Sequence, residues 1–154
     1  MSKVTFRKFV PKDAIHFKKL NMEWLERYFV VEPIDAIVLS NPQTEIIDKG
    51  GVIFMALLED QIIGTFAYIK KADGFFEFSK MAINPIHRGK GYGNSMMQFA
   101  LRYAKQHHWK KVVLYSSTNL ENAIYLYRKH GFIEVPLEKN LIYSRGNIKM
   151  EIGF

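Results

Sequence analysis

A six-residue stretch, Arg88-Gly89-Lys90-Gly91-Tyr92-Gly93, constrains the fold of this chain most strongly, because it joins a strand-like run to a helix-like run. The run before it ends in Met81-Ala82-Ile83, and the amphipathic run after it starts near Asn94. Three glycines let the backbone approach a ligand without Cβ atoms in the way. The helix that follows directs its free N–H groups and the positive end of its dipole toward the loop. Strand, loop and helix together predict a pyrophosphate site.

The spacing of apolar residues predicts an α+β fold, with a mixed, mostly antiparallel central sheet flanked by helices. Early strands follow one another through short turns such as Glu59-Asp60, and later strands alternate with helices. No internal repeat or linker interrupts the chain, so residues 1–154 are expected to form a single domain. A short helix over 34–39 is left open, because prolines and glycines punctuate that part. The expected strands are 4–9, 52–58, 62–70, 75–83, 111–115, 132–135 and 147–152, and the expected helices are 13–29, 91–107 and 120–130.

Cysteine is absent, which excludes a disulfide framework, a thiolate nucleophile and a cysteine metal site. The five histidines match no metal-binding spacing such as HExxH, so no metal is expected. The N-terminal residues have no apolar signal core, and no apolar run approaches the roughly 18 residues that span a bilayer. These observations predict a cytoplasmic protein with no membrane partner.

The net charge of +7 is concentrated in residues 84–154, which contain eleven Lys or Arg and four Asp or Glu. This half of the chain also contains the glycine loop. A polyphosphate ligand would explain the placement of the charge, and a solvated basic surface explains it equally well. The basic residues are scattered rather than grouped in blocks, so no nucleic-acid partner is expected.

The pattern of glycines narrows the class of fold. The Rossmann, kinase and P-loop patterns are absent, and the chain has R-x-x-G-x-G instead. Together with Lys80-Met81-Ala82-Ile83-Asn84-Pro85 before it, this pattern resembles the GNAT superfamily of acyl-CoA-dependent N-acyltransferases. Residues 119–132 (NLENAIYLYRKHGF) resemble the later helix of the same family, through Asn, Ala, Leu-Tyr and Gly-Phe landmarks. The resemblance covers about residues 50–135, with both motifs in the family's order.

The resemblance implies that acetyl-CoA is the co-substrate, without a metal. In the family, the strand before the loop splays from its neighbour, and its free backbone groups pair with the pantetheine arm. The loop amides hold the pyrophosphate, and Arg88 and Lys90 add positive charge; an exposed pair of cations and an ordinary tight turn are the alternatives. Asn119 would contact the cofactor or order water. The residues implied in cofactor binding are Met81, Ala82, Ile83, Arg88, Gly89, Lys90, Gly91, Tyr92, Gly93, Asn94 and Asn119.

Tyr127 has the helix position of the family's catalytic tyrosine, where a phenol can protonate or stabilise a departing thiolate. A half-buried packing tyrosine is the alternative. An alkyl amine titrates at about 10.4 and must lose a proton before it attacks. Glu77, between two phenylalanines on a predicted strand, is the candidate base, with an ordered water or a merely solvent-facing side chain as alternatives. Tyr125 lies on another side of the helix and is expected to pack.

The implied activity is direct transfer of an acetyl group to the primary amine of a small molecule in a ternary complex, without a covalent enzyme intermediate. A protein N-terminus or lysine as acceptor, and a non-catalytic acetyl-CoA-binding module, are the rival functions. A homodimer is common in the family, and the turn at 143–146 is a candidate for the acceptor pocket or a dimer contact. The family shapes that pocket around the first helix, where the candidates are Trp24, Tyr28, Phe29 and Glu32, with core aromatics and surface acids as the alternative.

Overall fold

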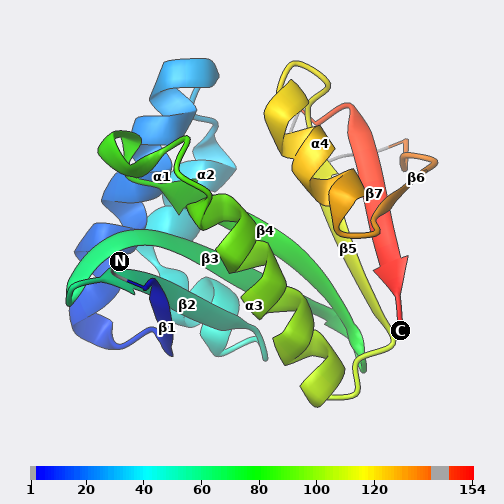
Figure 1. The fold of residues 1–154 in the computed structure, drawn as a ribbon, viewed down its shortest axis with the longest axis horizontal. Helices are drawn as coiled ribbons and strands as arrows, with labels where there is room; N and C mark the ends of the chain where they lie inside the picture. Colours follow the sequence, from blue (N-terminus) through cyan, green and yellow to red (C-terminus); the bar gives the residue numbers. More distant parts are fainter. Residues whose placement is uncertain (1–2, 140–145) are drawn as a thin grey trace.

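The computed structural model describes residues 3–139 and 146–154 and arranges their strands in one sheet of order β1-β2-β3-β4-β5-β7-β6 (Figure 1). Neighbouring strands are antiparallel except β4 and β5, which are parallel, so the predicted α+β fold with a mostly antiparallel sheet is confirmed. The strands are β1 (Thr5–Lys8), β2 (Val52–Leu58), β3 (Gln61–Ala72), β4 (Phe75–Ile83), β5 (Lys111–Ser116), β6 (Ile133–Val135) and β7 (Ile148–Gly153). The helices are α1 (Ala14–Tyr28), α2 (Pro33–Ser40), α3 (Tyr92–Gln106) and α4 (Glu121–Lys129), with the short turns η1 (Pro11–Asp13), η2 (Gln43–Ile47) and η3 (Pro85–His87).

Helices cover both faces of the sheet. In the view of Figure 1, α1 and α2 lie behind the strands of the N-terminal half, whereas α3 and α4 lie in front. Successive side chains along β2 point to opposite faces of the sheet, so this strand contributes residues to the core on each face. Phe54 and Ala56 belong to the core on the α3 side, and Ile53 and Met55 belong to the core around α1 and α2. The sheet therefore separates two apolar cores.

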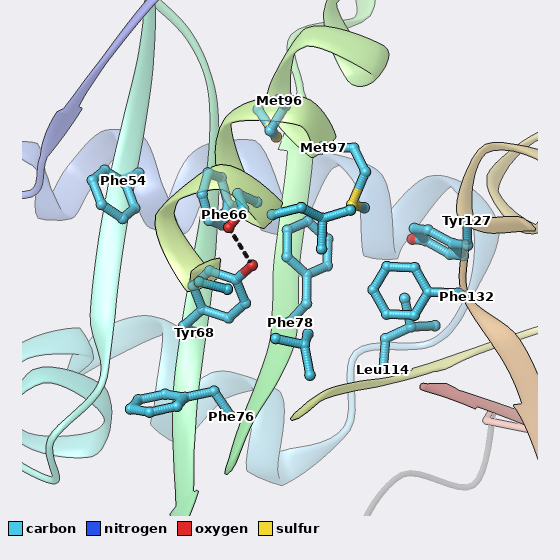
Figure 2. Close-up of a cluster of buried hydrophobic side chains, with 14 of the residues drawn as sticks. Phe54, Phe66, Tyr68, Phe76, Phe78, Met96, Met97, Leu114, Tyr127 and Phe132 are labelled. Carbon is cyan, nitrogen blue, oxygen red and sulfur yellow. Dashed lines mark hydrogen bonds between the residues drawn. The ribbon is translucent and has the colours of Figure 1, made fainter. Parts of the chain in front are cut away.

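The larger core is aromatic and lies between the sheet and α3 (Figure 2). Phe66 stacks on Phe54 and on Phe78, with ring centroids 5.3 Å and 5.2 Å apart. Aromatic pairs of this kind stabilise a core beyond the area that they bury. The buried Tyr68 donates a hydrogen bond from its hydroxyl to the carbonyl oxygen of Ala100 at 2.8 Å, and burial raises its pKa. This bond ties β3 to α3.

The sheet divides where β4 meets β5. The two strands pair at three positions, and beyond Glu77 and Val113 they no longer pair. β4 stays paired with β3 as far as Ile83, while β5 stays paired with β7 as far as Ser116. We call the unpaired region beyond Glu77 and Val113 the β4–β5 split, and it leaves backbone groups on the two facing edges without a partner strand. The three pairs are Phe75 with Lys111, Phe76 with Val112 and Glu77 with Val113.

β4 also bulges beside this split. Lys80 and Met81 together oppose a single residue of β3, Phe66, and Lys80 has φ = +55°. A residue with a Cβ in this left-handed conformation costs about 1 to 3 kcal/mol, so the surrounding strands must hold it there. A bulge bends its strand and redirects the side chains next to it. The end of β4 is therefore shaped locally as well as separated from β5.

The predicted elements agree with the structure to within two residues at each end, and the segment left open at 34–39 is α2. The turn at Glu59-Asp60 is confirmed as a two-residue hairpin connection, with φ of +51° and +65°. Within residues 3–139 and 146–154, no helix is long and apolar enough to cross a membrane.

We expect Tyr68→Phe to lower the free energy of unfolding by about 1 to 2 kcal/mol, because a buried carbonyl oxygen loses its side-chain partner. Urea denaturation would measure the change. Tyr28→Phe is the matched control, since the side chain of Tyr28 is exposed and its midpoint should not move. A wild-type midpoint for Tyr68→Phe would show that the bond contributes no net stability.

Candidate active site

The glycine loop continues β4 and leads into α3. Asn84 fixes its start, because its amide donates to the carbonyl oxygen of Ile63 at 2.7 Å and its side-chain oxygen accepts from the amide of Ile86 at 3.2 Å. Gly89 and Gly91 follow with φ of +75° and +86°, a conformation that residues with a Cβ rarely adopt. A Cβ at either position would meet no atom within 4 Å. The path of the backbone, rather than crowding inside the protein, therefore requires these two glycines.

The N-terminus of α3 is suited to an anion. Gly91 is the N-cap, no side chain caps the helix, and its first turn contains no acidic residue. The first amides of the helix consequently have no acceptor within it, and the dipole adds positive potential at the same point. Lys90 is exposed beside these amides. These features fit the pyrophosphate of a CoA molecule, as the resemblance implied, and the contact itself stays a prediction.

Gly93 lies where three elements converge. A Cβ at this position would be 3.5 Å from Met81 Cε and 3.7 Å from Ile83 Cδ1, both on β4, and 3.6 Å from Leu126 Cδ2 on α4. The start of α3 therefore packs directly on the end of β4 and on α4. The structure thus brings together three of the residues implied in cofactor binding, Met81, Ile83 and Gly93.

Asn94 joins α3 to the end of α4. Its side-chain oxygen lies 2.8 Å from Nε2 of His130, the residue that ends α4, which places a hydrogen bond between the two helices. Burial and the nearby Lys129 lower the pKa of His130, which favours the neutral ring. The resemblance implied cofactor binding for Asn94 and gave no role to His130. The partners are 36 residues apart in sequence, so no local pattern could reveal the pair.

Tyr127 is buried on the inner side of α4. Its side chain lies in the larger core, with its ring edge-on to that of Phe132 at a centroid distance of 6.0 Å (Figure 2). Burial raises its pKa to about 12, so the phenol is protonated at neutral pH. Its hydroxyl has no hydrogen-bond partner among the described residues. The prediction that Tyr125 packs was wrong, because its side chain is 71% exposed on the outer side of α4.

Glu77 is the last residue of β4 that pairs with β5, so it lies where the β4–β5 split begins. Its neighbours Phe76 and Phe78 belong to the core on the α3 side, and the carboxylate therefore faces the opposite side of the sheet. The side chain is 12% exposed and lies 3.2 Å from Nζ of Lys71. Within the described residues this carboxylate pairs with Lys71, and its place at the start of the split would bring it close to a molecule bound there.

Tyr127 and Glu77 thus lie on opposite faces of the sheet. Tyr127 shares its core with Phe78 of β4 and Leu114 of β5, whose side chains face α3 and α4. Glu77 faces the other layer. A single molecule can contact both groups only by lying in the β4–β5 split, where no backbone ladder separates the two faces.

Arg88 is turned toward the protein. Its Nε donates to the carbonyl oxygen of Ile83 at 2.9 Å, and its Nη2 lies 2.7 Å from the Glu23 carboxylate on α1. The resemblance implied that Arg88 adds positive charge beside the phosphates. In the structure that charge is paired, and of the two implied cations Lys90 is the exposed one.

The predicted acceptor residues gather at the end of α1. Trp24 lies beside Tyr28 and Phe29, with centroid distances of 6.2 Å and 5.5 Å, and Tyr28 is 48% exposed. Glu32 is the N-cap of α2, and its amide donates to the carboxylate of the buried Asp35 at 2.9 Å. The three aromatic side chains therefore form one cluster, next to the connection between α1 and α2.

Two other predicted positions are less informative. Asn119 is exposed in the loop between β5 and α4, where its amide lies 3.3 Å from the hydroxyl oxygen of the buried Ser117. The turn at 143–146, a candidate for the pocket or a dimer contact, lies outside the described residues except for Gly146.

The sequence pattern missed a polar cluster next to Glu77. The hydroxyl of Tyr115 on β5 lies 2.9 Å from both carboxylate oxygens of Glu138, and Lys149 of β7 pairs with the same carboxylate. Lys149 and Tyr115 hold the pKa of Glu138 at about 2. Burial and the carboxylates of Glu138 and Glu77 raise the pKa of Tyr115. Strand alternation could place Tyr115 on the same face as Glu77, but not its partner 23 residues away.

A model of the Acetyltransferase (GNAT) family matches residues 18–132, which include the glycine loop, the split and Tyr127. The chain belongs to the GNAT family. This GNAT chain is 27% identical over 106 residues to streptothricin acetyltransferase A from Bacillus subtilis (strain 168). The match covers 69% of this chain and 61% of the curated relative's length.

Solved GNAT structures share the fold over nearly the whole chain. A GNAT-family acetyltransferase from Staphylococcus aureus Mu50 gives a TM-score of 0.85 at 14% identity, covering 98% of this chain and 99% of that one. Spermidine N-acetyltransferase from Vibrio cholerae, solved with CoA and spermine, gives a TM-score of 0.75 at 24% identity, covering 97% and 95%. At these identities the likeness shows the fold. The GNAT family uses acetyl-CoA, and within residues 3–139 and 146–154 no group of three or more His, Asp or Glu could hold a metal ion.

We expect Gly91→Ala to weaken CoA binding about tenfold, because a Cβ at a left-handed N-cap costs about 1 to 2 kcal/mol and shifts the loop amides. Calorimetric titration with CoA would measure this. Gly74→Ala is the matched control, since Gly74 has φ = +73° in the turn between β3 and β4. It should lose similar stability and keep its CoA affinity, and equal affinities for the two variants would contradict the role of the loop.

Proposed function

We propose that this protein transfers an acetyl group from acetyl-CoA to a primary amine of a small molecule, by direct attack in a ternary complex. The observation that carries the proposal is the β4–β5 split, with the glycine loop at the end of β4 and with Tyr127 and Glu77 on its two faces. Residues 1–154 would form a single acyltransferase domain. The names of the relatives, which specify streptothricin and spermidine, support a small molecule as acceptor.

Some of the predicted cofactor residues would bind acetyl-CoA through their backbone groups and others through their side chains. The amides from Gly89 to Asn94 would hold the pyrophosphate, with Lys90 adding charge from the exposed side. The unpaired edge of β4 at Met81, Ala82 and Ile83 would align the pantetheine arm in place of the missing strand. When bound, acetyl-CoA supplies a thioester, and its carbonyl carbon is the atom that the amine attacks. Asn119 would contact the arm or a water from the other side of the split.

Glu77 would remove a proton from the acceptor. An alkyl ammonium with a pKa of about 10.4 cannot attack until it loses a proton. Glu77 faces the layer that contains the aromatic cluster of Trp24, Tyr28 and Phe29, so an amine that arrives from that side would approach the face of the sheet on which this carboxylate lies. The first proton of the ammonium passes to Glu77, directly or through a water, and the neutral amine forms the C–N bond as the C–S bond breaks. The second proton that the nitrogen must lose would pass through water to the departing sulfur, which leaves as the thiol.

Tyr127 would stabilise the sulfur that departs. Burial raises the pKa of Tyr127 to about 12, so the phenol holds its proton and can donate a hydrogen bond to the sulfur without complete proton transfer. A hydrogen bond from the phenol to the developing negative charge is favourable in this apolar setting and needs no such transfer. Tyr127 would therefore act by stabilising the charge that develops on the sulfur.

Two rival functions predict different results from those of a small-molecule acetyltransferase. A non-catalytic acetyl-CoA-binding module would bind the thioester without turnover, and acetylation of a protein N-terminus or lysine would need an open peptide groove. The clustering of Trp24 with Tyr28 and Phe29 favours the small-molecule acceptor. The homodimer and the cytoplasmic location stay predictions.

Titration with acetyl-CoA, CoA and ATP in a calorimeter tests the proposal. We expect micromolar binding of acetyl-CoA and CoA and much weaker binding of ATP, followed by thiol release when amine acceptors are screened. Absence of binding by both acetyl-CoA and CoA would overturn the proposal. Binding without turnover for any amine would favour the non-catalytic module.

We expect Tyr127→Phe to lower kcat about 10²-fold and to leave the Kd of CoA unchanged, because the lost hydroxyl acts on the departing sulfur. Thiol-release kinetics and calorimetry would separate these quantities. Tyr125→Phe removes the same hydroxyl from the exposed side of α4 and should behave as wild type. Equal kcat for the two variants would leave Tyr127 as a packing residue.

Glu77→Gln is expected to lower kcat by about 10²-fold or more, since the general base is lost, while CoA affinity is retained. Glu151→Gln is the matched control, because Glu151 opposes Val113 from β7 and is likewise paired with a lysine, Lys111. If the loss for Glu77→Gln disappears at high pH, where the amine is already neutral, the base assignment is supported. A kcat that is low at every pH by the same factor would contradict it.

A further inference from the structure

Arg88, the first residue of the glycine pattern, is bonded to protein through two of its three guanidinium nitrogens, and its side chain is 25% exposed. Its Nε bonds the carbonyl oxygen of Ile83, the last residue of β4, and its Nη2 bonds Glu23 of α1. Its third nitrogen, Nη1, is shielded from solvent and has no hydrogen-bond partner in the described chain. One guanidinium therefore joins the end of β4, the loop and α1.

This arrangement differs from that of a phosphate-binding arginine. Such an arginine presents its planar pair of N–H groups to the ligand, and its charge is available to the phosphate. Here the charge of Arg88 is paired with Glu23, whose Oε2 lies 2.7 Å from Nη2, and the Glu23 side chain is itself only 34% exposed. Arg27 lies 3.9 Å from the other oxygen of Glu23, with a largely exposed side chain.

The loop needs an anchor of this kind. Between Asn84 and the start of α3 the backbone passes through two left-handed glycines, and Gly89 and Gly91 have no atoms near the point where a Cβ would be. Glycine loops have high conformational entropy when they are not held from outside. Amides that must converge on one pyrophosphate bind it best when they are already fixed in place.

We propose that Arg88 does not bind phosphate but acts as a strut, by which we mean that its bonds to Ile83 and Glu23 hold the glycine loop in place. Glu23 is then a positioning residue for the CoA site. The inference rests on the proposed function, because it concerns the same pyrophosphate loop. It assigns to CoA binding an acidic side chain on α1, a helix that the family resemblance connects only with the acceptor. Glu23 contributes by holding Arg88, and Arg88 contributes by holding the loop.

The strut and the ligand interpretations predict opposite signs for one substitution. If Arg88 were a phosphate ligand restrained by Glu23, Glu23→Gln would free its charge and remove a nearby negative charge, so CoA would bind more tightly. If Arg88 is a strut, Glu23→Gln loosens the loop, and CoA binds more weakly although the protein has become more positive.

The experiment is calorimetric titration of wild type, Glu23→Gln and Glu26→Gln with CoA. Glu26 is exposed three residues further along α1, so Glu26→Gln makes the same change in net charge without touching Arg88. We expect CoA affinity to fall at least about fivefold for Glu23→Gln and to stay within twofold for Glu26→Gln. Unchanged or tighter binding by Glu23→Gln would overturn the proposal.

Variants of Arg88 provide a second, independent readout. Arg88→Lys keeps the charge but replaces the two nitrogens that bond Ile83 and Glu23 with one ammonium nitrogen, which cannot reproduce the planar fork. The strut therefore predicts a loss close to that of Arg88→Ala. Glu23→Gln should then cause no further loss in the Arg88→Ala background, while Lys90→Gln should add its own effect. Retention of wild-type affinity by Arg88→Lys, or additive losses for Glu23 and Arg88, would contradict the strut.

Thermal unfolding of each unliganded variant identifies any that fails to fold, and the conservative Glu23→Gln keeps the test valid if Arg88→Ala does not fold. The failure of this inference is distinguishable from the failure of the proposed function. Wild type that binds no CoA removes both, whereas wild type that binds CoA as tightly as Glu23→Gln removes the strut alone.

Discussion

The end of the backbone ladder between β4 and β5 is the constraint on which the rest of this structure depends. After Glu77 and Val113 the two strands lose their mutual hydrogen bonds while each keeps its outer neighbour. Unpaired backbone groups are costly when buried, so such an edge persists where another partner can satisfy it. The glycine loop, the N-terminus of α3 and the inner side of α4 all lie around this one interruption.

The split also places the two candidate catalytic groups in different surroundings. Tyr127 lies in an apolar core and keeps its proton well above neutral pH, whereas Glu77 lies on the opposite face beside Lys71. A continuous sheet would keep groups on its two faces apart. An interrupted one lets both act on a molecule that lies in the plane of the strands. The separation of roles is therefore a property of the sheet rather than of either side chain.

Much of the fold could be predicted from the sequence, because its signals are local. Apolar runs bounded by turn residues located β2 and β4 to the residue, and helical periodicity located α3. Helix periodicity also has a limit, shown by Tyr125: it says which residues share a face, but not whether another element covers that face. The bulge at Lys80 could not be predicted for a related reason, since neither lysine nor methionine is a residue type that favours a left-handed conformation.

The parts of the site that escaped prediction are contacts between distant segments. Arg88 and Glu23 are 65 residues apart, and Asn94 and His130 are 36 residues apart. Packing of whole elements decides such partners, so a motif can place Arg88 in the loop without saying where its guanidinium points.

The three-pair junction of β4 and β5 has a mechanical consequence as well. The strands on either side of it form two blocks, each with its own helix in front, and few backbone bonds hold the blocks together across the seam. The side chains of the larger core lie on both sides of the seam, with Phe78 on β4 and Leu114 on β5. Side-chain packing, more than the backbone ladder, therefore holds the two blocks together beyond Glu77 and Val113.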